Sequence, residues 1–461
     1  MKLTDYKQVH MIGIKGAGMT ALAELLMTHG RAVTGSDTEE VFYTDSILSK
    51  YGVVPFVGFD ESHIGSEIDL VIYSTAYNKE TNPELKEALS QAKTVLSYPE
   101  AVGMLTQEWQ TLAVCGTHGK TTTSALLAHT LKTIGEDPSA IIGSKIASWG
   151  GSALLGKGKY FVLEADEYQN KLAQYQPFGA ILTSVDYDHP DFFPTEESYR
   201  ETFKQFVARI PRHGRLMYCF DNSDVVEVAK SATTATHSYG FVAGADYQIV
   251  HWEALSEGMY RQRFEVLHNG ESLGFYELIL AGRHNALNAT AVIGLLLELG
   301  MDQNLIREAV KTFVGTERRF EFLGERFGAL IYDDYAHHPE EIRTTLRSFR
   351  ELFPERRLRA VFHPHTYTRT KALLSEFAQS FDDADSVIVL PIYGSAREVQ
   401  GGVSSEDLVQ AINRFIPHKA ETGESIEQVT LELEKDMGRS DLIVTLGAGN
   451  VWEISHALAK K

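Results

Sequence analysis

Residues Thr111–Ser124 have the sequence TLAVCGTHGKTTTS, an apolar run followed by a glycine-rich turn. The apolar residues Leu112–Val114 are typical of a buried strand, and the residues after Lys120 have the composition of a helix. A glycine turn between a strand and a helix presents backbone N–H groups and the positive end of the helix to a phosphate chain. We therefore expect a phosphate-binding loop. It has the shortened form GTxGKTT, because Val114 stands where the longer pattern has a glycine.

The side chains of this loop suggest how ATP would be held. Lys120 can place a positive charge on the outer phosphates, and Thr121 or Thr122 can offer a hydroxyl to Mg²⁺. A plain strand-to-helix turn with a surface lysine is the competing interpretation. It is disfavoured because the glycines, the lysine and the threonines all fall at the junction where a phosphate would lie. The predicted ATP contacts of the loop are Gly116, Thr117, His118, Gly119, Lys120, Thr121 and Thr122.

Two strands downstream of the loop end in acidic residues. The segment Tyr160–Tyr168 begins as an apolar strand and continues into three acidic side chains. The apolar strand Ala180–Val185 is followed by two aspartates and a histidine. A single acidic strand end is often only a solvated turn, but two of them after one phosphate loop indicate a place to hold Mg²⁺ against a triphosphate. The residues concerned are Glu164, Asp166, Glu167, Asp186, Asp188 and His189.

The N-terminal segment also predicts a nucleotide-binding unit. Gln8–Ile14 is expected to be a strand, and it meets the glycine-rich GIKGAGM before a helical pattern and a second strand that ends at Asp37. The GxxGxG spacing differs from the GxGxxG of nicotinamide dinucleotide sites, so such a cofactor is not favoured. A further strand is expected at Thr94–Glu100. Ser74 and Thr75 end another apolar strand, where they can serve as ligand contacts or as ordinary turn residues.

The segment Leu280–Gly300 has the spacing of a helix with polar residues at its start. Asn285 and Asn288 are three residues apart and share a helix face, so both can reach a purine edge. The same asparagines, with His284, also suit N-terminal capping of a core helix, and the sequence leaves these two interpretations open. Residues 213–279 are expected to be strands and turns that carry no chemistry.

Residues after Thr316 predict a third α/β region, because apolar strands alternate with helical segments. The strand that ends in DDYAHHPEE is followed by a helix that begins at Pro339, and RLRAVFHPHTYTRT contains a second strand. The histidine groups HHP and HPH lack a closed zinc-ligand spacing, so a zinc site is disfavoured. Guanidinium groups pair bidentately with carboxylate and phosphate, so the arginines of this region are better suited to binding anions. They are Arg318, Arg319 and Arg369.

The composition limits the kinds of partner. With 461 residues the chain exceeds the usual size of one domain, and its formal net charge of −19 argues against nucleic acid or an anionic membrane as the main partner. Two cysteines are too few for a disulfide framework, and neither a signal core nor an apolar run of membrane-spanning length is present. We therefore expect a cytoplasmic protein.

Taken in order, these motifs resemble those of one family. The Mur ligases, ATP-dependent amide-forming enzymes of peptidoglycan precursor synthesis, have a similar series: GIKGAGM, GTHGKTTT, EADE, DYDHPD, GRHNALNA, ERRFE, DDYAHHPEE, HPHTYTRT, AREVQGGVSSEDLV and LGAGN. The resemblance runs from about Val9 to Gly449 and is strongest to members that add L-alanine. It implies an α/β fold of three domains. These are a Rossmann-like UDP-sugar-binding domain at 1–107, a central phosphate-loop (P-loop) ATP-binding domain with a mostly parallel sheet at 108–314, and a Rossmann-like C-terminal domain at 315–461.

The resemblance also implies an activity and a set of site residues. The activity is ligation of L-alanine to the lactyl carboxylate of UDP-N-acetylmuramate through an acyl phosphate, with ATP and two Mg²⁺ ions, releasing ADP and phosphate. The residues implied for the UDP-sugar are Gly13, Lys15, Gly16, Ala17, Gly18, Asp37, Ser74 and Thr75. Those implied for ATP beyond the loop are Asn285, Asn288, Arg319 and Asp334, and those for Mg²⁺ are Thr121, Glu164 and His189. Those implied for the amino acid are Tyr335, His337 and Arg369, and those for catalysis are Lys120, His189, His337 and Arg369.

Two departures from the family pattern and two alternative functions remain. Ser184 stands where an asparagine is common, and Thr366 stands where many relatives carry a second arginine or lysine, so alanine would depend more on Arg369. A ligase that adds a whole tripeptide to the same UDP-sugar shares these motifs, and a non-catalytic nucleotide-sugar sensor is an alternative of a different class. The sequence leaves open the acceptor, the general base, and whether the protein is a monomer or a homodimer.

Overall fold

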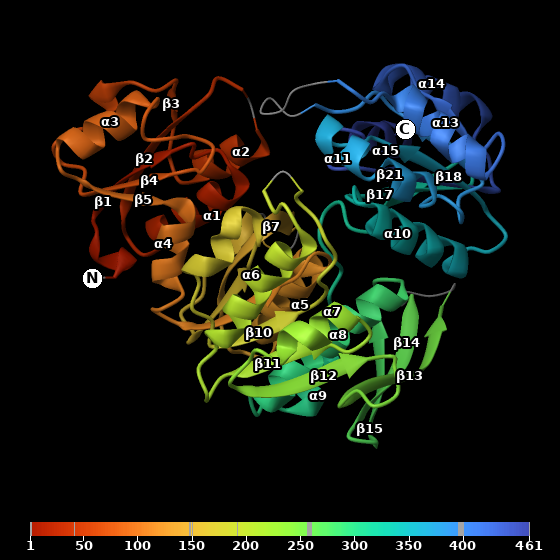
Figure 1. The fold of residues 1–461 in the computed structure, drawn as a ribbon, viewed down its shortest axis with the longest axis horizontal. Helices are drawn as coiled ribbons and strands as arrows, with labels where there is room; N and C mark the ends of the chain where they lie inside the picture. Colours follow the sequence, from red (N-terminus) through yellow and green to blue (C-terminus); the bar gives the residue numbers. More distant parts are fainter. Residues whose placement is uncertain are drawn as a thin grey trace. The chain divides into compact units, whose positions relative to one another are not determined.

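The computed structural model describes residues 2–460 except 41, 147, 148, 150, 191, 256–260 and 395–400. The chain forms three sheets with helices between their strands (Figure 1). It groups into two compact units. Unit 1 comprises Met1–Asp186, Glu197–Tyr247 and Ala291–Ala309, and unit 2 comprises Tyr187–Glu196, Gln248–Thr290 and Val310–Lys461. The expected α/β class, with three mostly parallel sheets, is confirmed. The residue boundaries expected for the three domains stay a prediction.

The first sheet lies in unit 1 and has the strand order β3-β2-β1-β4-β5, with every pair parallel. Its strands are β1 (Gln8–Ile12), β2 (Ala32–Asp37), β3 (Phe56–Val57), β4 (Leu70–Tyr73) and β5 (Thr94–Ser97). The helices around it are η1 (Leu3–Asp5), α1 (Ala17–Thr28), α2 (Tyr43–Lys50), η2 (Glu61–His63), α3 (Pro83–Ser90) and α4 (Tyr98–Leu105). The residues Val9–Ile12 and Leu70–Ile72 of the central strands are buried on both faces, as parallel strands covered by helices are.

Strand β5 is shorter than the sequence suggested. We expected a strand over Thr94–Glu100, but α4 begins at Tyr98 with Pro99 in its first turn. Proline has no N–H to give to a sheet and its fixed φ suits the first turn of a helix, so the strand ends at Ser97. The backbone N–H of Ser97 donates to the Glu100 carboxylate at 2.7 Å, which closes the start of the helix.

The second sheet carries the phosphate loop. Within unit 1 its strand order is β12-β11-β10-β6-β9-β7-β8, and all pairs are parallel except β7 with β8. These strands are β6 (Gln110–Cys115), β7 (Ser139–Ile146), β8 (Gly151–Leu154), β9 (Tyr160–Glu164), β10 (Gly179–Leu182), β11 (Arg215–Cys219) and β12 (Ala235–Gly240). The helices that follow them are α5 (Lys120–Thr133), η3 (Tyr168–Gln174), α6 (Glu196–Ala208), α7 (Ser223–Ala229) and α9 (Gln303–Val310). Because β6 lies between the parallel strands β9 and β10, the loop and both acidic strand ends meet at one edge of the sheet.

The region at 213–279 is mostly strands, as expected, with α7 as an unexpected helix. After β12 come β13 (Tyr247–Ala254), β14 (Gln262–His268) and β15 (Glu271–Leu278), of which β14 and β15 pair antiparallel. The predicted helix at Leu280–Gly300 is present as α8 (Arg283–Glu298).

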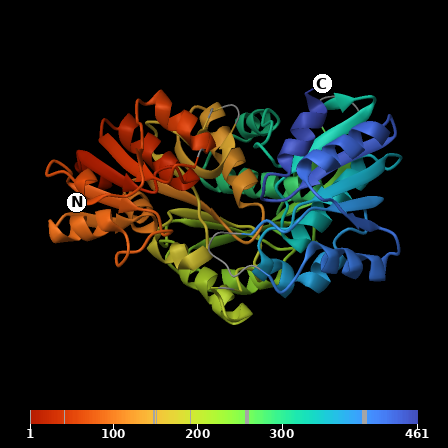
Figure 2. The same cartoon turned by 90° about the horizontal axis from the view of Figure 1, so that it is seen from above.

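The third sheet lies in unit 2 and has the order β16-β17-β21-β18-β19-β20, with β16 antiparallel and the others parallel (Figure 2, teal to blue). Its strands are β16 (Glu321–Arg326), β17 (Ala329–Asp334), β18 (Arg357–Phe362), β19 (Ser386–Val389), β20 (Ala420–Thr422) and β21 (Asp441–Leu446). Its helices are α10 (Pro339–Leu352), α11 (Tyr367–Ala372), α12 (Leu374–Ala378), α13 (Ser405–Phe415), α14 (Ile426–Asp436) and α15 (Trp452–Ala459). Leu442 and Val444 of β21 pack into one hydrophobic cluster and Ile443 into another, so apolar layers cover both faces.

Two further expectations concern the AREVQGGVSSEDLV motif and membrane-spanning helices. Part of the AREVQGGVSSEDLV motif, residues 396–400, lies outside the described residues, and its last part forms the start of α13. None of the helices in the described part of the chain has the length and apolar content that a membrane span requires.

Candidate active site

The phosphate loop connects β6, which ends at Cys115, to α5, which begins at Lys120. Gly119 precedes the helix at φ 77°, in the left-handed region that glycine adopts without strain. At Gly116, where φ is 135°, a Cβ atom would lie 2.2 Å from Oγ1 of Thr183. Both glycines are therefore required by the backbone, and the predicted strand, turn and helix are confirmed.

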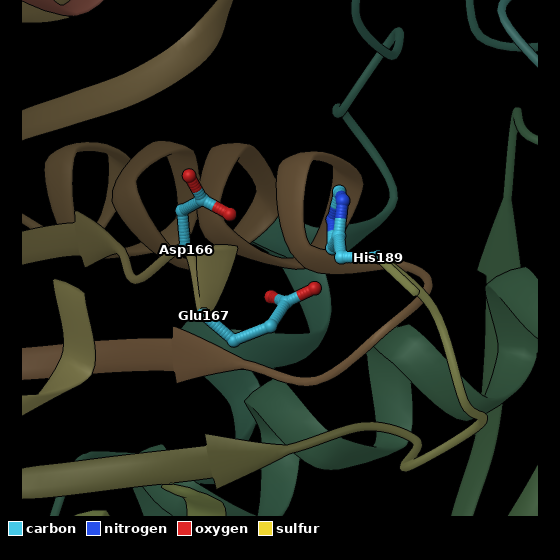
Figure 3. Close-up of side chains that lie close together, drawn as sticks. All are labelled: Asp166, Glu167 and His189. Atoms are coloured by element: carbon cyan, nitrogen blue, oxygen red, sulfur yellow. The ribbon is translucent and has the colours of Figure 1, made fainter. Parts of the chain in front are cut away.

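The ammonium of Lys120 is held at the loop by oxygen atoms. Nζ donates to the carbonyl of Thr117 at 3.0 Å and to Oε2 of Glu167 at 2.9 Å. Burial lowers the pKa of Lys120, but the charges of Glu167 and Asp166 outweigh it and raise the pKa above its ordinary value. The lysine is therefore charged. Figure 3 shows the carboxylates of Asp166 and Glu167 beyond the end of β9, and it also labels His189, which belongs to unit 2.

Thr121 and Glu164 are joined directly. Oγ1 of Thr121 donates to Oε1 of Glu164 at 2.7 Å, and Oε2 of Glu164 accepts the backbone N–H of Gly143 at 2.6 Å. The threonine lies in the first turn of α5 and the glutamate ends β9. Two of the predicted Mg²⁺ ligands thus lie within one hydrogen bond of each other. Both offer oxygen atoms, the donor type that Mg²⁺ prefers.

The residues after β10 tie the second acidic strand end to the loop. The backbone N–H of His118 donates to Oγ of Ser184 at 2.9 Å, and Oγ1 of Thr117 donates to the carbonyl of Asp186 at 2.8 Å. The departure from asparagine at Ser184 therefore keeps a hydrogen bond to the loop. The Asp186 carboxylate lies 3.6 Å from Nε2 of His118.

The N-terminal glycine turn is built against the end of β2. The backbone N–H of Gly13, which has φ 80°, donates to the carbonyl of Ser36 at 2.8 Å. The backbone N–H of Lys15 donates to Oδ2 of Asp37 at 2.7 Å, and α1 follows with Gly16 as its N-cap. The predicted glycine turn before a helix is thus present. The first turn of α1 contains the other predicted residues, Ala17 and Gly18.

Other predicted UDP-sugar residues are engaged with their own chain. Nζ of Lys15 donates to the carbonyl of Glu40 at 2.8 Å, so its charge is used within the domain. Oγ of Ser74 accepts the backbone N–H of Ala76 at 3.3 Å, which is turn chemistry, and Thr75 is exposed. Ser74 thus takes part in a turn, and its contact with a ligand stays a prediction.

The two asparagines of α8 share one face, as predicted. Nδ2 of Asn288 donates to Oδ1 of Asn285 at 3.2 Å, and Nδ2 of Asn285 donates to the carbonyl of Ala281 at 2.7 Å. Burial, with the charge of Arg319, lowers the pKa of the neighbouring His284 to about 4. The imidazole of His284 is therefore uncharged near neutral pH.

Arg319 and Asp334 both lie in unit 2. The Arg319 guanidinium lies 4.9 Å from the centre of the Tyr335 ring, and its Nε is buried without a hydrogen-bond partner among the described residues. Asp334 accepts the backbone N–H groups of Phe320 at 2.7 Å and Ala336 at 2.8 Å. Burial raises the pKa of Asp334 to about 6, although Arg319 opposes this.

His337 is a neutral imidazole. Burial lowers its pKa to about 3, with Glu341 opposing the shift and Arg369 adding to it. Nδ1 lies 3.0 Å from the carbonyl of Tyr335, and a carbonyl can only accept, so Nδ1 carries the proton and Nε2 the lone pair. The backbone N–H of His337 donates to Glu341 at 3.0 Å.

The segment Tyr187–Glu196 contributes Asp188 and His189 to unit 2. His189 has φ 57°, and its backbone N–H donates to Oδ1 of Asp188 at 2.7 Å. Nη2 of Arg369 lies 3.3 Å from both carboxylate oxygens of Asp188. Oγ1 of Thr366 accepts the backbone N–H of Arg369 at 3.4 Å, so the residue that replaces a second cation caps the helix that carries Arg369.

One buried cluster was not predicted. Glu84, in the first turn of α3, accepts hydrogen bonds from Ser36 and His63 at 2.5 Å each and lies 3.4 Å from Nε2 of His10. Burial raises the pKa of Glu84, but hydrogen bonds from His10, Ser36 and His63 outweigh it, so the pKa is lowered. These residues meet only through the folded sheet and its loops, so no spacing in the sequence connects them.

The comparisons with known proteins identify the family. Three descriptions of one family match in order: "Mur ligase family, catalytic domain" at residues 8–110, "Mur ligase middle domain" at 114–296, and "Mur ligase, glutamate ligase domain" at 318–449. The UDP-N-acetylmuramate--L-alanine ligase of Desulfitobacterium hafniense is 38% identical over 98% of this chain and 99% of its own. The enzyme of the same name from Treponema pallidum is 38% identical over 98% of this chain and 96% of its own.

Solved structures give the same result. The UDP-N-acetylmuramate-alanine ligase MurC of Thermotoga maritima has a TM-score of 0.82 and 25% identity, with 98% of each chain covered. A murein peptide ligase from Psychrobacter arcticus has a TM-score of 0.70 and 25% identity, again with 98% of each chain covered. Because the three family descriptions together match most of the chain, and a relative is 38% identical over 98% of it, this chain belongs to the Mur ligase family.

Proposed function

We propose that the protein joins L-alanine to the lactyl carboxylate of UDP-N-acetylmuramate at the expense of ATP, in peptidoglycan precursor synthesis. The observation that carries this proposal is the match to L-alanine ligases over nearly the whole length of both chains. The charged Lys120 of the phosphate loop and the half-buried Arg319 supply the cations that phosphoryl transfer needs. The protein acts in the cytoplasm on small-molecule substrates.

The three domains are assigned separate tasks. Residues 1–107 bind the UDP-sugar, 108–314 bind ATP, and 315–461 bind the amino acid and the ribose and phosphates of ATP. These bounds are supported by the sheets, because β1–β5, β6–β15 and β16–β21 each fall within one range.

ATP is proposed to lie with its outer phosphates on the loop Gly116–Thr122. Lys120 would exchange the Glu167 carboxylate for phosphate oxygens, which are also anionic. Thr121, Glu164 and His189 would hold Mg²⁺, with two ions expected. The bonded pair of Thr121 and Glu164 supports this assignment, since both are oxygen donors. When bound, Mg²⁺ offsets the repulsion between a carboxylate and the triphosphate.

The rest of ATP is assigned to polar groups of α8 and unit 2. Asn285 and Asn288 would recognise adenine through their shared face, and Asp334 would accept a hydrogen bond from the ribose. Arg319 would contact the phosphates. Its buried Nε, without a partner among the described residues, supports this role, because an unpaired buried donor is costly unless a ligand satisfies it.

The UDP part of the sugar nucleotide is assigned to the glycine turn of the first domain. Backbone N–H groups at the start of α1 (Gly16, Ala17 and Gly18), with Gly13 giving the turn, would face the diphosphate, since a helix N-terminus favours anions. Lys15 would contribute mainly its backbone, because its ammonium donates to the backbone carbonyl of Glu40. The nearby Asp37, Ser74 and Thr75 complete the proposed site.

The amino acid is assigned to Tyr335, His337 and Arg369. The guanidinium of Arg369 would bind the carboxylate of alanine. His337 carries a lone pair on Nε2, but a group with a pKa of about 3 is a weak base. We therefore assign His337 to hydrogen bonding and orientation of the amine rather than to removal of its proton.

The reaction proceeds in two steps. The lactyl carboxylate oxygen attacks the γ-phosphorus of ATP, ADP leaves, and an acyl phosphate forms, because a free carboxylate is too poor an electrophile for amide formation. The neutral amine of alanine then attacks the acyl carbon, loses a proton, and phosphate leaves from the tetrahedral intermediate. Lys120 would stabilise the charge that develops on the transferred phosphoryl group.

The proposal is tested by measuring ADP release with UDP-N-acetylmuramate, Mg²⁺ and a series of acceptors. L-Alanine should support turnover, and glycine and L-serine should be poorer. Turnover only with L-Ala-D-Glu-diaminopimelate would make the protein a tripeptide-adding ligase. Binding of the sugar nucleotide without ADP release for any acceptor would favour the non-catalytic sensor.

A further inference from the structure

Arg369 already has a carboxylate partner in unit 2. Its Nη2 lies 3.3 Å from both Oδ1 and Oδ2 of Asp188, and the two side chains are only 11% and 9% exposed. Among the described residues, the Arg369 guanidinium has no hydrogen-bond partner other than the Asp188 carboxylate. The partner is thus a single side-chain carboxylate, the same chemical group that an amino acid carries on its Cα.

Asp188 is held in this position by a second contact, besides the one to Arg369. Oδ1 also accepts the backbone N–H of His189 at 2.7 Å, which fixes the side chain without using Arg369. Loss of the arginine contact would therefore leave Asp188 with a hydrogen bond to the backbone.

The contact is a weak form of an arginine–carboxylate pair. Strong pairs use two parallel N–H···O bonds of about 2.7–2.9 Å, whereas here one nitrogen serves both oxygens at a longer distance. Both bidentate faces of a guanidinium include Nη2, one with Nε and one with Nη1. Asp188 therefore occupies the nitrogen that an incoming carboxylate would use on either face.

We propose that Asp188 competes with the carboxylate of the amino-acid substrate for Arg369, and that acceptor binding displaces it. This inference rests on the proposed function, in which Arg369 binds that carboxylate. A free amino acid can form both bonds of a bidentate pair, which Asp188 does not form here, so displacement exchanges a weaker pair for a stronger one. Asp188 thereby sets the concentration of acceptor at which the site fills.

The test is the effect of Asp188→Asn on the KM for L-alanine, with ATP, UDP-N-acetylmuramate and Mg²⁺ saturating. Asparagine has the same shape and keeps an oxygen for the His189 N–H, but it lacks the competing charge. The KM for L-alanine should fall about three- to tenfold, while the KM values for the other two substrates stay within about twofold. Damage to the fold would instead raise KM or lower kcat for all of them.

A matched control removes another aspartate–arginine pair in the same unit. Asp436 lies 2.8 Å from Nη1 of Arg359, which is 12% exposed, and neither residue is assigned to the proposed site. Asp436→Asn should leave the KM for L-alanine unchanged. An unchanged or raised KM in Asp188→Asn would overturn the competition.

The variant Arg369→Ala distinguishes failure of this inference from failure of the proposed function. If Arg369→Ala leaves the KM for L-alanine unchanged while the native protein turns over, Arg369 does not bind the carboxylate and the inference fails, although the ligase assignment stands. If the native protein releases no ADP with L-alanine, the proposed function itself fails, and the inference fails with it.

Discussion

The ammonium of the partly exposed Lys120 and the buried carboxylate of Glu167 form an ion pair, 2.9 Å between Nζ and Oε2. The hydroxyl of Tyr199 donates to the other oxygen of Glu167 at 3.1 Å, so the carboxylate is fixed from two sides. The loop lysine is therefore charged and oriented by the protein's own side chains. A phosphate oxygen would replace one anionic partner by another, without any change in the protonation of the lysine.

Lys120→Ala is expected to abolish ADP release, because the charge that stabilises the transferred phosphoryl group is lost. We expect a fall in kcat/KM of about a hundredfold or more, measured with UDP-N-acetylmuramate, L-alanine and Mg²⁺. Lys132→Ala is the matched control, since Lys132 lies exposed in the last turn of the same helix α5. Equal rates in the two variants would remove Lys120 from the mechanism.

Ser184→Ala is expected to weaken ATP binding without unfolding the protein. Its hydroxyl accepts the backbone N–H of His118 at 2.9 Å, and the alanine variant leaves that loop N–H without its partner. The KM for ATP should rise about three- to tenfold, with thermal stability nearly unchanged. Ser184→Asn restores an acceptor and should recover most of the affinity. A similar KM for ATP in all three proteins would show that this bond does not position the loop.

ATP binding is expected to depend on pH through Asp334. Burial raises its pKa to about 6, so the carboxylate is ionised above this pH and protonated below it. As the pH falls through 6, Asp334 becomes a weaker hydrogen-bond acceptor for the ribose, and the KM for ATP should rise. Measurement of this KM between pH 5 and 8 should show the inflection in the native protein and lose it in Asp334→Asn. His337→Gln should keep it, because the pKa of His337 is about 3.

Glu24→Gln is expected to stabilise the protein at high pH. Burial in α1 raises the pKa of Glu24 to about 7, against the charge of Lys50 and a hydrogen bond from Tyr51. A carboxyl with a raised pKa stabilises the folded state fully below its ordinary pKa of 4.5, and this contribution is lost as the pH rises through 7. The variant should melt a few degrees, about 2–4 °C, above the native protein at pH 8, and at nearly the same temperature at pH 5.

The control for this prediction is Glu80→Gln, which removes the same charge from an exposed position. It should change the melting temperature little at either pH. A similar gain in both variants would mean that relief of the net charge of −19, rather than burial of Glu24, is responsible.

The parts of the fold and site that the sequence predicted are local. The glycines around Lys120, the apolar strand before it and the helix after it lie next to each other in the chain, so their pattern is visible in a short window. Strand β16 is only half-buried and alternates weakly, and it was not predicted. The predicted end of β5 was wrong because α4 begins within the same apolar run, with Pro99 in its first turn.

The contacts that the sequence could not predict join distant residues. Lys120 and Glu167 are 47 positions apart, and Arg369 and Asp188 are 181 positions apart. Each of these four residues stood out as a charged group in a motif, but which acid meets which cation depends on the order of strands in the folded sheets. Residue type therefore predicted the kind of chemistry, and only the tertiary structure supplied the pairing.

The buried glutamate of α3 is expected to restrict which residues can replace its hydrogen-bond partners during evolution. Ser36, His63 and His10 all direct polar atoms at Glu84, whose side chain is fully buried. A change of Glu84 to an apolar residue would leave several buried groups without a partner, at a cost of about 1–3 kcal/mol each. These four positions are therefore expected to covary among descendants of one ancestor, with both histidines kept wherever the glutamate is kept. The evolution of the first domain is thus restricted by hydrogen bonds inside its sheet as well as by the nucleotide it is proposed to bind.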